Sequence, residues 1–380
     1  MYPRLTSLTI KNYKSINSAR ITLEPLTVLV GPNGAGKSNC VDALAFIQQS
    51  LSGSVELAFK KRGGIGAVRR KSLGHPTNIF LSLTLLLNEN LKAYYAFAIS
   101  AKTNKHFNIA KEVCIVYDTK RNIKHIYGIK NGEFRIPIPG VRAQIFPDRL
   151  GLIIASATEE FRPVFDFLSS MRFYSIEPNK IRELQEPDMG YYLNKDGSNA
   201  SAILKKIIDS DTGNVLYEKI CNLLAIISTG ISSVEYNSTG HKETLTFKQD
   251  VGAKYPWKFD ALNMSDGTLR ALGLLLAVYQ QGYNPLIAIE EPEATVNPAV
   301  AETVFQILSD ASKFRQILIT THSPDVLDQK DLREEQIKVV TMDRGKTIVS
   351  NISEANRQAI KEKLYTPGEL LRIGELNPPD

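Results

Sequence analysis

A glycine-rich loop near the start of the chain has the residue types and spacing that bind a triphosphate. The loop 31–38 reads GPNGAGKS and follows the apolar run Leu26–Val30. Glycines let backbone N–H groups approach phosphate oxygens, and a helix that begins after the loop aims its N-terminus at the anion. In such a loop the lysine reaches the β- and γ-phosphates and the serine ligates Mg²⁺. We therefore predict that ATP is bound by Asn33, Gly34, Ala35, Gly36, Lys37, Ser38 and Asn39.

A pair of carboxylates lies far downstream, where the apolar run Pro285–Ile289 leads into Glu290 and Glu291. A short continuous apolar run predicts a strand that is buried on both faces. The chain turns at the end of that strand, so both carboxylates can reach one phosphate site. We assign Glu290 to Mg²⁺ and Glu291 to the attacking water as general base. Taken alone, the pair fits an acidic turn equally well, and the loop 31–38 favours the catalytic interpretation.

Ser265 and Gly267 precede the apolar-rich segment 269–279, whose spacing predicts a helix. Ser265 is then the N-cap, and the start of the helix offers a hydroxyl and free N–H groups to an anion. An ordinary helix cap is the alternative. The position of this segment, about twenty residues before the acidic strand, favours a role in binding nucleotide.

His322 follows another apolar run, 316–320, which predicts a further strand. A histidine at the carboxyl end of a parallel strand faces the ligand crevice of the sheet. There it can polarise the γ-phosphate or the attacking water. The alternative is a structural or solvated side chain, since the chain has five histidines.

These predicted strands, with a helix after the loop 31–38, indicate an α/β protein with a parallel or mixed core sheet. Two strand-like runs, 79–87 and 93–99, predict an antiparallel side sheet. The segment from 101 to about 180 shows short strands and turns and becomes helical near 161–171, without a heptad pattern, which favours a compact helical and β insertion. A hairpin over 337–342 and 346–349 and a final turn or helix over 365–371 complete the chain.

We expect four segments along the chain. The ATPase head comprises 1–100, with the P-loop, and 251–345, with the acidic pair and His322. Between them lies an insertion or lid, 101–250, and a tail, 346–380, follows.

The order of the motifs resembles that of ABC-type ATPases: the P-loop, then S-D-G-T, E-E-P-E and T-H-S. The opening segment Ile10–Ile16 and the loop GPNGAGKSN resemble the heads of SMC, RecF and OLD proteins and of related AAA ATPases. The resemblance implies a P-loop NTPase fold of the ABC type. It also implies that Ser265 and Gly267 of one subunit close over the ATP on the P-loop of another, so that a head-to-tail dimer holds two ATP molecules.

The resemblance leaves other family positions less defined. Gln144 and Gln185 are both candidates for the Q-loop glutamine, and Asn297 falls where transporter-type ATPases have the aspartate that couples the two sites. OLD nucleases continue with a metal-binding TOPRIM domain. The chain has neither the length nor a clustered acidic set for it, so we expect a head without a fused nuclease.

The composition is that of a globular protein, since 380 residues with 43% hydrophobic content suffice for one large or two medium domains. No run has the length of a membrane span and the start lacks a signal-peptide layout, so we expect a cytoplasmic protein without a membrane partner. Cys40, Cys114 and Cys221 follow no metal spacing and are expected to be reduced core residues.

The net charge of +6 is modest, but a basic cluster follows the P-loop helix. Its members, with no acidic residue among them, are Lys60, Lys61, Arg62, Arg69 and Arg70. A solvated face and a contact with the phosphate backbone of duplex DNA are both open interpretations. The stretch has little aromatic interleaving, which argues against base stacking.

The hypothesis that joins these features is a Mg²⁺-dependent ATPase that dimerises around ATP. It would couple this cycle to duplex DNA or to a separate effector protein, in anti-phage defence or DNA repair. The alternatives are a RecF-like repair ATPase that acts alone on DNA, a scaffold that ATP locks without hydrolysis, and an ABC transporter subunit.

Overall fold

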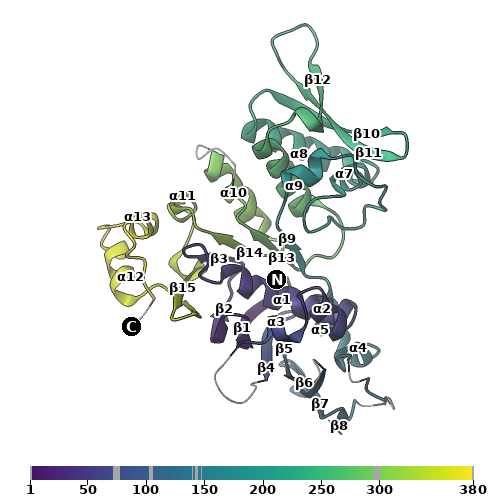
Figure 1. Ribbon diagram of the computed structural model, residues 1–380, viewed down its shortest axis with the longest axis vertical. Helices are drawn as coiled ribbons and strands as arrows, with labels where there is room; N and C mark the ends of the chain where they lie inside the picture. Colours follow the sequence, from purple (N-terminus) through teal and green to yellow (C-terminus); the bar gives the residue numbers. More distant parts are fainter. Residues whose placement is uncertain are drawn as a thin grey trace.

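One large mixed sheet organises the molecule (Figure 1). In this computed structural model, the structure describes residues 2–71, 78–101, 106–138, 140–141, 144–146, 148–294 and 300–378. The sheet has 13 strands in the order β8-β7-β6-β5-β4-β1-β2-β16-β15-β3-β14-β13-β9. The fold is therefore α/β with a mixed core sheet, as the sequence predicted.

The parallel half of the sheet carries the predicted motif strands. Neighbouring parallel pairs join β9 to β13, β13 to β14, β14 to β3 and β3 to β15. The bounds are Leu26–Val30 for β3, Arg172–Tyr174 for β9, Leu286–Glu290 for β13, Gln316–Thr321 for β14 and Ile337–Asp343 for β15. Strands β3 and β14 are buried throughout, which explains their continuous apolar runs.

The antiparallel half alternates buried and more exposed residues, as expected for a sheet covered on one face. Its strands are β1 (Arg4–Tyr13), β2 (Ile16–Thr22), β4 (Ile79–Leu86), β5 (Leu91–Ala101), β6 (Phe107–Asp118), β7 (Ile123–Lys130), β8 (Glu133–Ile136) and β16 (Lys346–Ser350). The strands predicted over 79–87 and 93–99 are thus confirmed as β4 and β5. Part of the segment that we predicted to be a lid, 101–250, lies in this sheet as β6 to β9.

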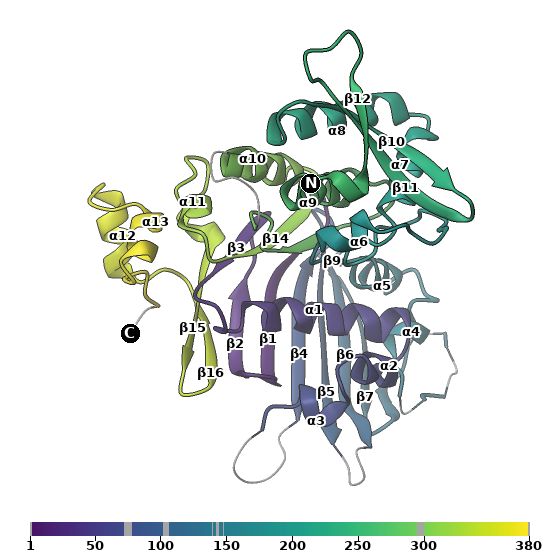
Figure 2. The same ribbon diagram turned by 45° about the horizontal axis from the view of Figure 1, so that its top comes forward.

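Helix α1 (Lys37–Ser52) crosses one face of the sheet (Figure 2). It packs with α2 (Val55–Lys60), α3 (Ile65–Val68), α4 (Leu152–Ala155) and α5 (Arg162–Ser169) over one hydrophobic core. A second core lies on the other face of β3, since Leu26, Val28 and Val30 belong to it whereas Leu29 belongs to the first. The sheet is therefore covered on both faces at the strand that leads into the P-loop.

The second core supports a separate layer of helices and a small three-stranded sheet, seen at the top of Figure 1. The helices are α6 (Pro178–Arg182), α7 (Ala200–Ile208), α8 (Gly213–Ile227), α9 (Asp266–Tyr279) and α10 (Ala301–Ala311). The small sheet consists of β10 (Ile231–Thr239), β11 (Lys242–Gln249) and β12 (Trp257–Asp260), and a 3-10 turn, Ala261–Asn263, leads into α9.

The C-terminal segment docks beside the sheet through α11 (Pro324–Leu327). Helix α12 (Glu354–Lys361) and helix α13 (Pro367–Arg372) follow the predicted hairpin, which is confirmed as β15 and β16, and a 3-10 turn, Glu334–Gln336, precedes β15. Arg372 of α13 pairs with Asp325 at 2.7 Å and with Asp328 at 2.8 Å. The two ion pairs fasten α13 to α11.

Two smaller predictions concern composition. The three cysteines are buried and unpaired, as expected for core residues. Burial raises the pKa of the Cys40 thiol to about 12, so this residue next to the P-loop carries no thiolate at neutral pH. In the part of the chain that the structure describes, no helix is both long and apolar enough to cross a membrane.

Candidate functional site

The loop 31–36 joins β3 to α1 in a form that only glycine permits at two positions. Gly36 caps α1 with φ of 104°, and a Cβ there would lie 2.1 Å from the Thr347 hydroxyl oxygen. A Cβ on Gly31 would lie 2.0 Å from the Val340 carbonyl oxygen. Both contacts are far below a van der Waals distance, so the β15–β16 hairpin closes tightly under the loop. The predicted loop is therefore a tight glycine turn that leads directly into the N-terminus of α1, the geometry that suits an anion.

Lys37 lies folded against its own loop. Its Nζ donates hydrogen bonds to the carbonyl oxygens of Gly31 at 2.7 Å and Pro32 at 3.1 Å, and the residue is 6% exposed. Burial lowers the pKa of the Lys37 ammonium, while the carboxylates of Glu291 and Glu293 act in the opposite direction. These contacts hold the Lys37 ammonium group beside the loop 31–36, where it can pair with the negative charge of a triphosphate.

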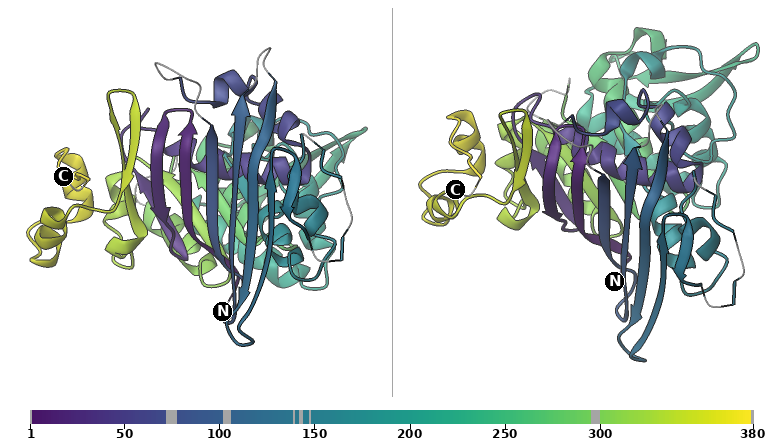
Figure 3. Two further views of the ribbon diagram at one scale, coloured as in Figure 1. Left: turned by 90° about the horizontal axis from the view of Figure 1, so that it is seen from below. Right: turned by 60° about the horizontal axis from the view of Figure 1, so that its bottom comes forward.

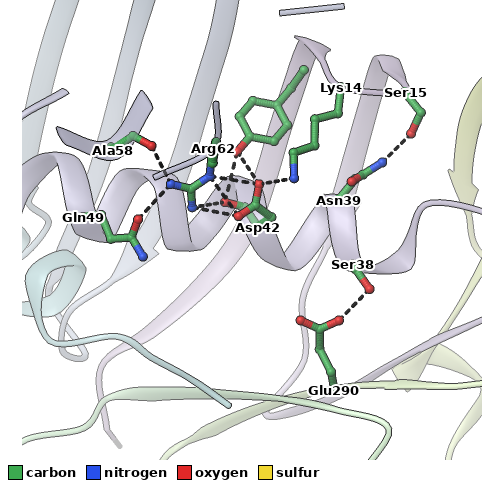
Figure 4. Close-up of polar contacts among 10 residues, drawn as sticks. Lys14, Ser15, Ser38, Asn39, Asp42, Gln49, Ala58, Arg62 and Glu290 are labelled. Carbon is green, nitrogen blue, oxygen red and sulfur yellow. Dashed lines mark hydrogen bonds and ion pairs between the residues drawn. The ribbon is translucent and has the colours of Figure 1, made fainter. Parts of the chain in front are cut away.

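Ser38 and Glu290 meet across the site, although they are far apart in sequence. The Ser38 hydroxyl donates to Glu290 Oε2 at 2.5 Å (Figure 4). A hydroxyl and a carboxylate oxygen at this separation match the sparse protein ligand set of Mg²⁺, which keeps waters and substrate phosphates in its other positions. Across the described ranges, no group of three or more His, Cys, Asp or Glu side chains is placed to hold a metal ion.

Glu291 and His322 directly follow the carboxyl ends of the neighbouring strands β13 and β14. His322 Nδ1 is 3.4 Å from Glu291 Oε1, and their side chains are 46% and 38% exposed. The backbone N–H of Glu291 donates to the carbonyl oxygen of Thr320 at 3.0 Å, and its φ is 45°, in the left-handed region. An exposed carboxylate fixed by a strained backbone can reach a water molecule, and the histidine beside it can orient either partner.

Glu293 is a member of this site to which sequence reasoning assigned no role. Its Oε1 accepts a hydrogen bond from the Thr321 hydroxyl, and its buried Oε2 has no partner among the described residues. Burial raises the pKa of the Glu293 carboxyl, and the Thr321 hydrogen bond opposes this shift. The only signal in the sequence was the third acidic residue of E-E-P-E.

Ser265 caps α9 as predicted. Its hydroxyl oxygen accepts a hydrogen bond from the Thr268 N–H at 3.2 Å, and Gly267 lies in the first turn. Arg182 of α6 holds the segment in place, because its guanidinium donates to the Met264 carbonyl oxygen at 3.0 Å and to Asp266 at 2.5 Å. Among the described residues, no hydrogen bond or ion pair joins 264–268 to the loop 31–38 of the same chain.

A chain of hydroxyl and amide contacts supports the P-loop from below. The Asn39 amide donates to Ser15 Oγ at 2.6 Å, Ser15 Oγ contacts Thr347 Oγ1 at 2.6 Å, and Thr347 Oγ1 donates to the Ala35 carbonyl oxygen at 2.9 Å. Asn33 and Gly34 lie exposed at the tip of the loop. Asn39 thus acts on the loop through Ser15 and Thr347, and no sequence signal indicated Thr347.

The predicted basic cluster divides in the structure. Lys60 and Lys61 are exposed. Arg62 points inward with 8% exposure and forms an ion pair with Asp42 at 2.7 Å, which Figure 4 shows. Arg70 donates to the carbonyl oxygens of Ser15 at 2.7 Å and Gly345 at 3.0 Å.

Arg62 and Arg70 therefore use their hydrogen-bond donors in contacts within the protein. The DNA-contact hypothesis needs side chains that are free to reach a phosphate. Arg69 is half-buried at the end of α3 and forms a β-bridge with Tyr13. Of the five predicted DNA contacts, Lys60 and Lys61 keep exposed ammonium groups.

Neither candidate for the Q-loop glutamine lies in the site. Gln185 is 3% exposed, and its side chain bonds the carbonyl oxygens of Lys180 and Ile181 and the N–H of Ser201. Gln144 is exposed in the connection after β8. The residue that directly follows β9, the neighbour of β13, is Ser175. Asn297 lies outside the described residues.

Two family models match the chain. Residues 4–139 match the AAA ATPase domain, and residues 152–328 match an AAA domain described as a putative AbiEii toxin of a type IV toxin–antitoxin system. The chain is 25% identical over 401 residues to the Old nuclease of Escherichia phage P2, which covers 95% of this chain and 63% of that protein. A stretch of 45 residues is 56% identical to the chromosome partition protein Smc of Mycolicibacterium paratuberculosis, covering 11% of this chain and 4% of that protein.

Solved structures agree on the fold. The SMC head domain from Pyrococcus furiosus, with an extended coiled coil and bound to the C-terminal domain of ScpA, superimposes with a TM-score of 0.55 at 12% identity and covers 95% of this chain and 99% of that one. An SMC head bound to the C-winged helix domain of ScpA gives a TM-score of 0.50 at 15% identity, with 94% and 100% covered.

The fold and the meeting of Lys37, Ser38 and the acidic strand define an ATPase of the ABC type with a P-loop. Within that class, the chain is similar to the Old nuclease in sequence and to the heads of SMC proteins in fold, and its two parts match AAA ATPase domains. It spans 63% of the length of the phage P2 relative.

Proposed function

We propose that the chain binds Mg·ATP at the loop 31–38 and hydrolyses it in a head-to-tail dimer. The observation that carries the proposal is the contact of Ser38 with Glu290, beside Lys37 and the Glu291–His322 pair. These groups lie at or beyond the carboxyl ends of β3, β13 and β14, which are parallel neighbours in the sheet. The arrangement supplies a cation for phosphate, ligands for a metal and a base for water.

Each side chain then has a distinct task. Lys37 leaves its own carbonyl oxygens and binds the β- and γ-phosphates, which offer it a stronger partner. Ser38 and Glu290 would hold Mg²⁺, which supplies neutralisation of phosphate charge when bound. Glu291 takes a proton from the attacking water, and His322 orients the base or the γ-phosphate.

The position of Ser265 supports the proposed dimer. Its cap is complete within α9, and no described contact brings it to the loop 31–38 of its own chain. A second subunit that approaches head to tail would place Ser265 and Gly267 against the γ-phosphate, where a helix N-terminus stabilises negative charge. Arg182 would keep the segment in the required form.

The ATPase cycle would drive duplex DNA or a separate effector protein, in anti-phage defence or DNA repair. Support comes from the relatives: one is named a nuclease, and two SMC heads of known structure are bound to domains of ScpA. This step is analogy, since one fold serves many functions. Two ammonium groups, of Lys60 and Lys61, remain for a contact with duplex phosphates.

A nucleotide-locked scaffold is the second candidate, because a closed dimer needs only binding. The strained Glu291 beside His322 favours hydrolysis, since a scaffold needs no base. A RecF-like enzyme acting alone on DNA and an ABC transporter subunit lack a specific supporting contact.

Steady-state ATP turnover tests the proposal. The purified protein is assayed with Mg²⁺, with and without duplex DNA, and Lys37→Ala is the blank because it removes the phosphate-binding ammonium group. We expect turnover that falls at least about a hundredfold in Lys37→Ala. Stimulation of turnover by DNA indicates a nucleic-acid ligand. Turnover that is the same with and without DNA indicates a protein effector. Equal turnover in Lys37→Ala would contradict the assigned site.

A further inference from the structure

One face of the antiparallel half-sheet has no helix over it among the described residues, as Figure 3 shows from below. Side chains alternate along these strands, so the register tells which residues share a face. Ile10, Leu81 and Phe97 are aligned on the core side, against the helices. Their neighbours Lys11, Phe80 and Ala98 are aligned on the opposite side, which we call the open face.

The open face is strongly cationic. Strands β1, β2 and β4 to β7 place six exposed basic side chains on it: Lys11, Arg20, Lys92, Lys111, Lys124 and Lys130. The described positions of these strands that share the face include no aspartate or glutamate. Glu133 stands opposite Lys130 at the outermost strand, β8, and pairs with Arg135 at 3.0 Å.

The arrangement of the lysines on the open face places like charges close together, which destabilises the sheet when nothing is bound. Lys111 and Lys130 are directly opposite each other on β6 and β7, and like charges in such a pair destabilise a sheet. Lys92 on β5 and Lys124 on β7 lie on the two sides of Tyr117, two strands apart, so they repel each other more weakly. A bound polyanion would relieve both repulsions, so charge complementarity indicates what covers this face.

An apolar floor lies between two basic rows, one formed by Lys111 and Lys130 and the other by Lys92 and Lys124. Tyr94, Ala96 and Val113 lie between the rows, and Phe80 is in register with Lys111 two strands away. Together they line a groove of about 560 Å³ that also reaches Lys111 and Lys130. The rows lie six residues apart along β6, from Lys111 to Tyr117, which is about 20 Å at the rise of a strand. A polyanion that also offers flat apolar groups would fill both the rows and the floor.

We infer that the open face binds single-stranded nucleic acid, with phosphates on the lysine rows and bases against Phe80, Tyr94 and the floor. A duplex fits less well because its bases are stacked inside, which would set a charged backbone on the apolar floor. The inference rests on the proposed function in taking nucleic acid as the ligand of the ATPase. It moves the main contact away from the cluster 60–70 and changes the ligand from duplex to single strand.

Fluorescence anisotropy with labelled oligonucleotides of about 16 nucleotides tests the inference. The full chain is titrated with single-stranded DNA, with the matching duplex and with polyglutamate as competitor. We expect the single strand to bind more tightly than the duplex. The double variant Lys111→Ala, Lys130→Ala should weaken binding about tenfold and reduce the slope of log affinity against log salt by about one.

Matched variants separate charge from damage to the fold. Lys111→Arg with Lys130→Arg keeps both charges and should keep the affinity, and Tyr94→Leu should lose about fivefold through lost stacking. Lys330→Ala with Lys361→Ala removes the same charge from exposed positions elsewhere and should leave binding unchanged. Unchanged affinity in the Lys111, Lys130 variant, tighter binding of the duplex, or competition by polyglutamate equal to that of the single strand would each overturn the inference.

The ATPase assay is run on the same preparation. If ATP turnover depends on Lys37 but DNA binding does not change in the open-face variants, this inference is wrong and the proposed ATPase function stands. Absence of turnover in a preparation that binds the single strand through the open face defeats the ATPase proposal instead.

Discussion

Glu291 has a backbone φ of 45°, in the left-handed region that residues other than glycine rarely adopt. Holding such a residue costs about 1–3 kcal/mol, and the Thr320 hydrogen bond and the neighbouring strand maintain it. We predict that Glu291→Gly raises the free energy of unfolding by about 1 kcal/mol because it removes the strain. The same change removes the base, so ATP turnover should fall at least about a hundredfold. Urea unfolding and steady-state turnover measure the two effects.

Glu291→Gln is the matched control, since it loses the base but keeps a side chain at the strained position. Its turnover should fall as far as that of Glu291→Gly, without the gain in stability. If Glu291→Gly were instead less stable than the native chain, the left-handed backbone would not be a source of strain.

Asp42 of the P-loop helix is the centre of a partly buried ionic cluster. It accepts hydrogen bonds from Tyr13 at 2.7 Å and Arg62 at 2.9 Å and pairs with Lys14 at 2.6 Å. Burial disfavours its charge, but the hydrogen bonds from Arg62, Lys14 and Tyr13 outweigh burial and lower the pKa of the carboxyl below its ordinary 3.8. A depressed carboxyl pKa gives stability that is present above the unfolded value and lost as pH falls through the folded value.

We therefore predict that Asp42→Asn lowers the free energy of unfolding by about 2–3 kcal/mol at neutral pH, because Arg62 loses its buried counter-charge. The difference from the native chain should stay constant between about pH 7 and 5 and shrink below about pH 4. Urea unfolding at several pH values measures it. A difference that does not change with pH would show that the charge of Asp42 does not carry the effect.

At the scale of elements, Glu112 fastens α4 to the side sheet. Its Oε1 accepts from the hydroxyls of Tyr95 at 3.0 Å and Tyr127 at 2.8 Å and from the N–H of Leu152 at 2.8 Å. Its Oε2 accepts from the N–H of Gly151 at 2.6 Å. We predict that Glu112→Gln costs about 2–3 kcal/mol of stability, because its amide group would direct a donor at the Gly151 N–H.

Hydrogen exchange locates the effect of Glu112→Gln. Protection should be lost first at the amide groups of Gly151 and Leu152, which lose a clean acceptor, and the exchange of α9 should stay unchanged. Glu243→Gln is a comparison at another mostly buried glutamate, whose Oε2 has no partner among the described residues. Equal protection at α4 in the Glu112→Gln variant would contradict the assigned fastening.

The sequence predicts those elements best whose pattern follows from complete burial. Strands β3, β13 and β14 appear as apolar runs because both of their faces are covered, and Ser265 caps α9 as its residue type suggests. The three-residue strand β9 has no such pattern, and it belongs to the core sheet only because it pairs with β13.

Side-chain direction was beyond the reach of sequence patterns. Arg62 and Lys61 are adjacent and equally basic, yet one faces Asp42 and the other faces solvent. Thr347 contacts the P-loop from a strand more than three hundred residues away in sequence, as its hydrogen bond to Ala35 shows. Such contacts depend on tertiary packing, which local spacing does not encode.

At the scale of the whole molecule, the two halves of the proposed nucleotide site lie in separate layers of each chain. Lys37, Ser38 and Glu291 lie at the large sheet, whereas Ser265 lies on α9, in the layer built on the second core. A head-to-tail dimer would join the halves of two chains, and each site would draw on both subunits.

A complementation assay tests this shared site most directly. Lys37→Ala removes the P-loop function and Ser265→Arg removes the α9 function, so each variant alone should be inactive. In an equal mixture, half of the dimers are mixed and have one complete site of two, so turnover should return to about a quarter of the native rate. A mixture as inactive as the separate variants, with the native chain active, would contradict a site shared between subunits.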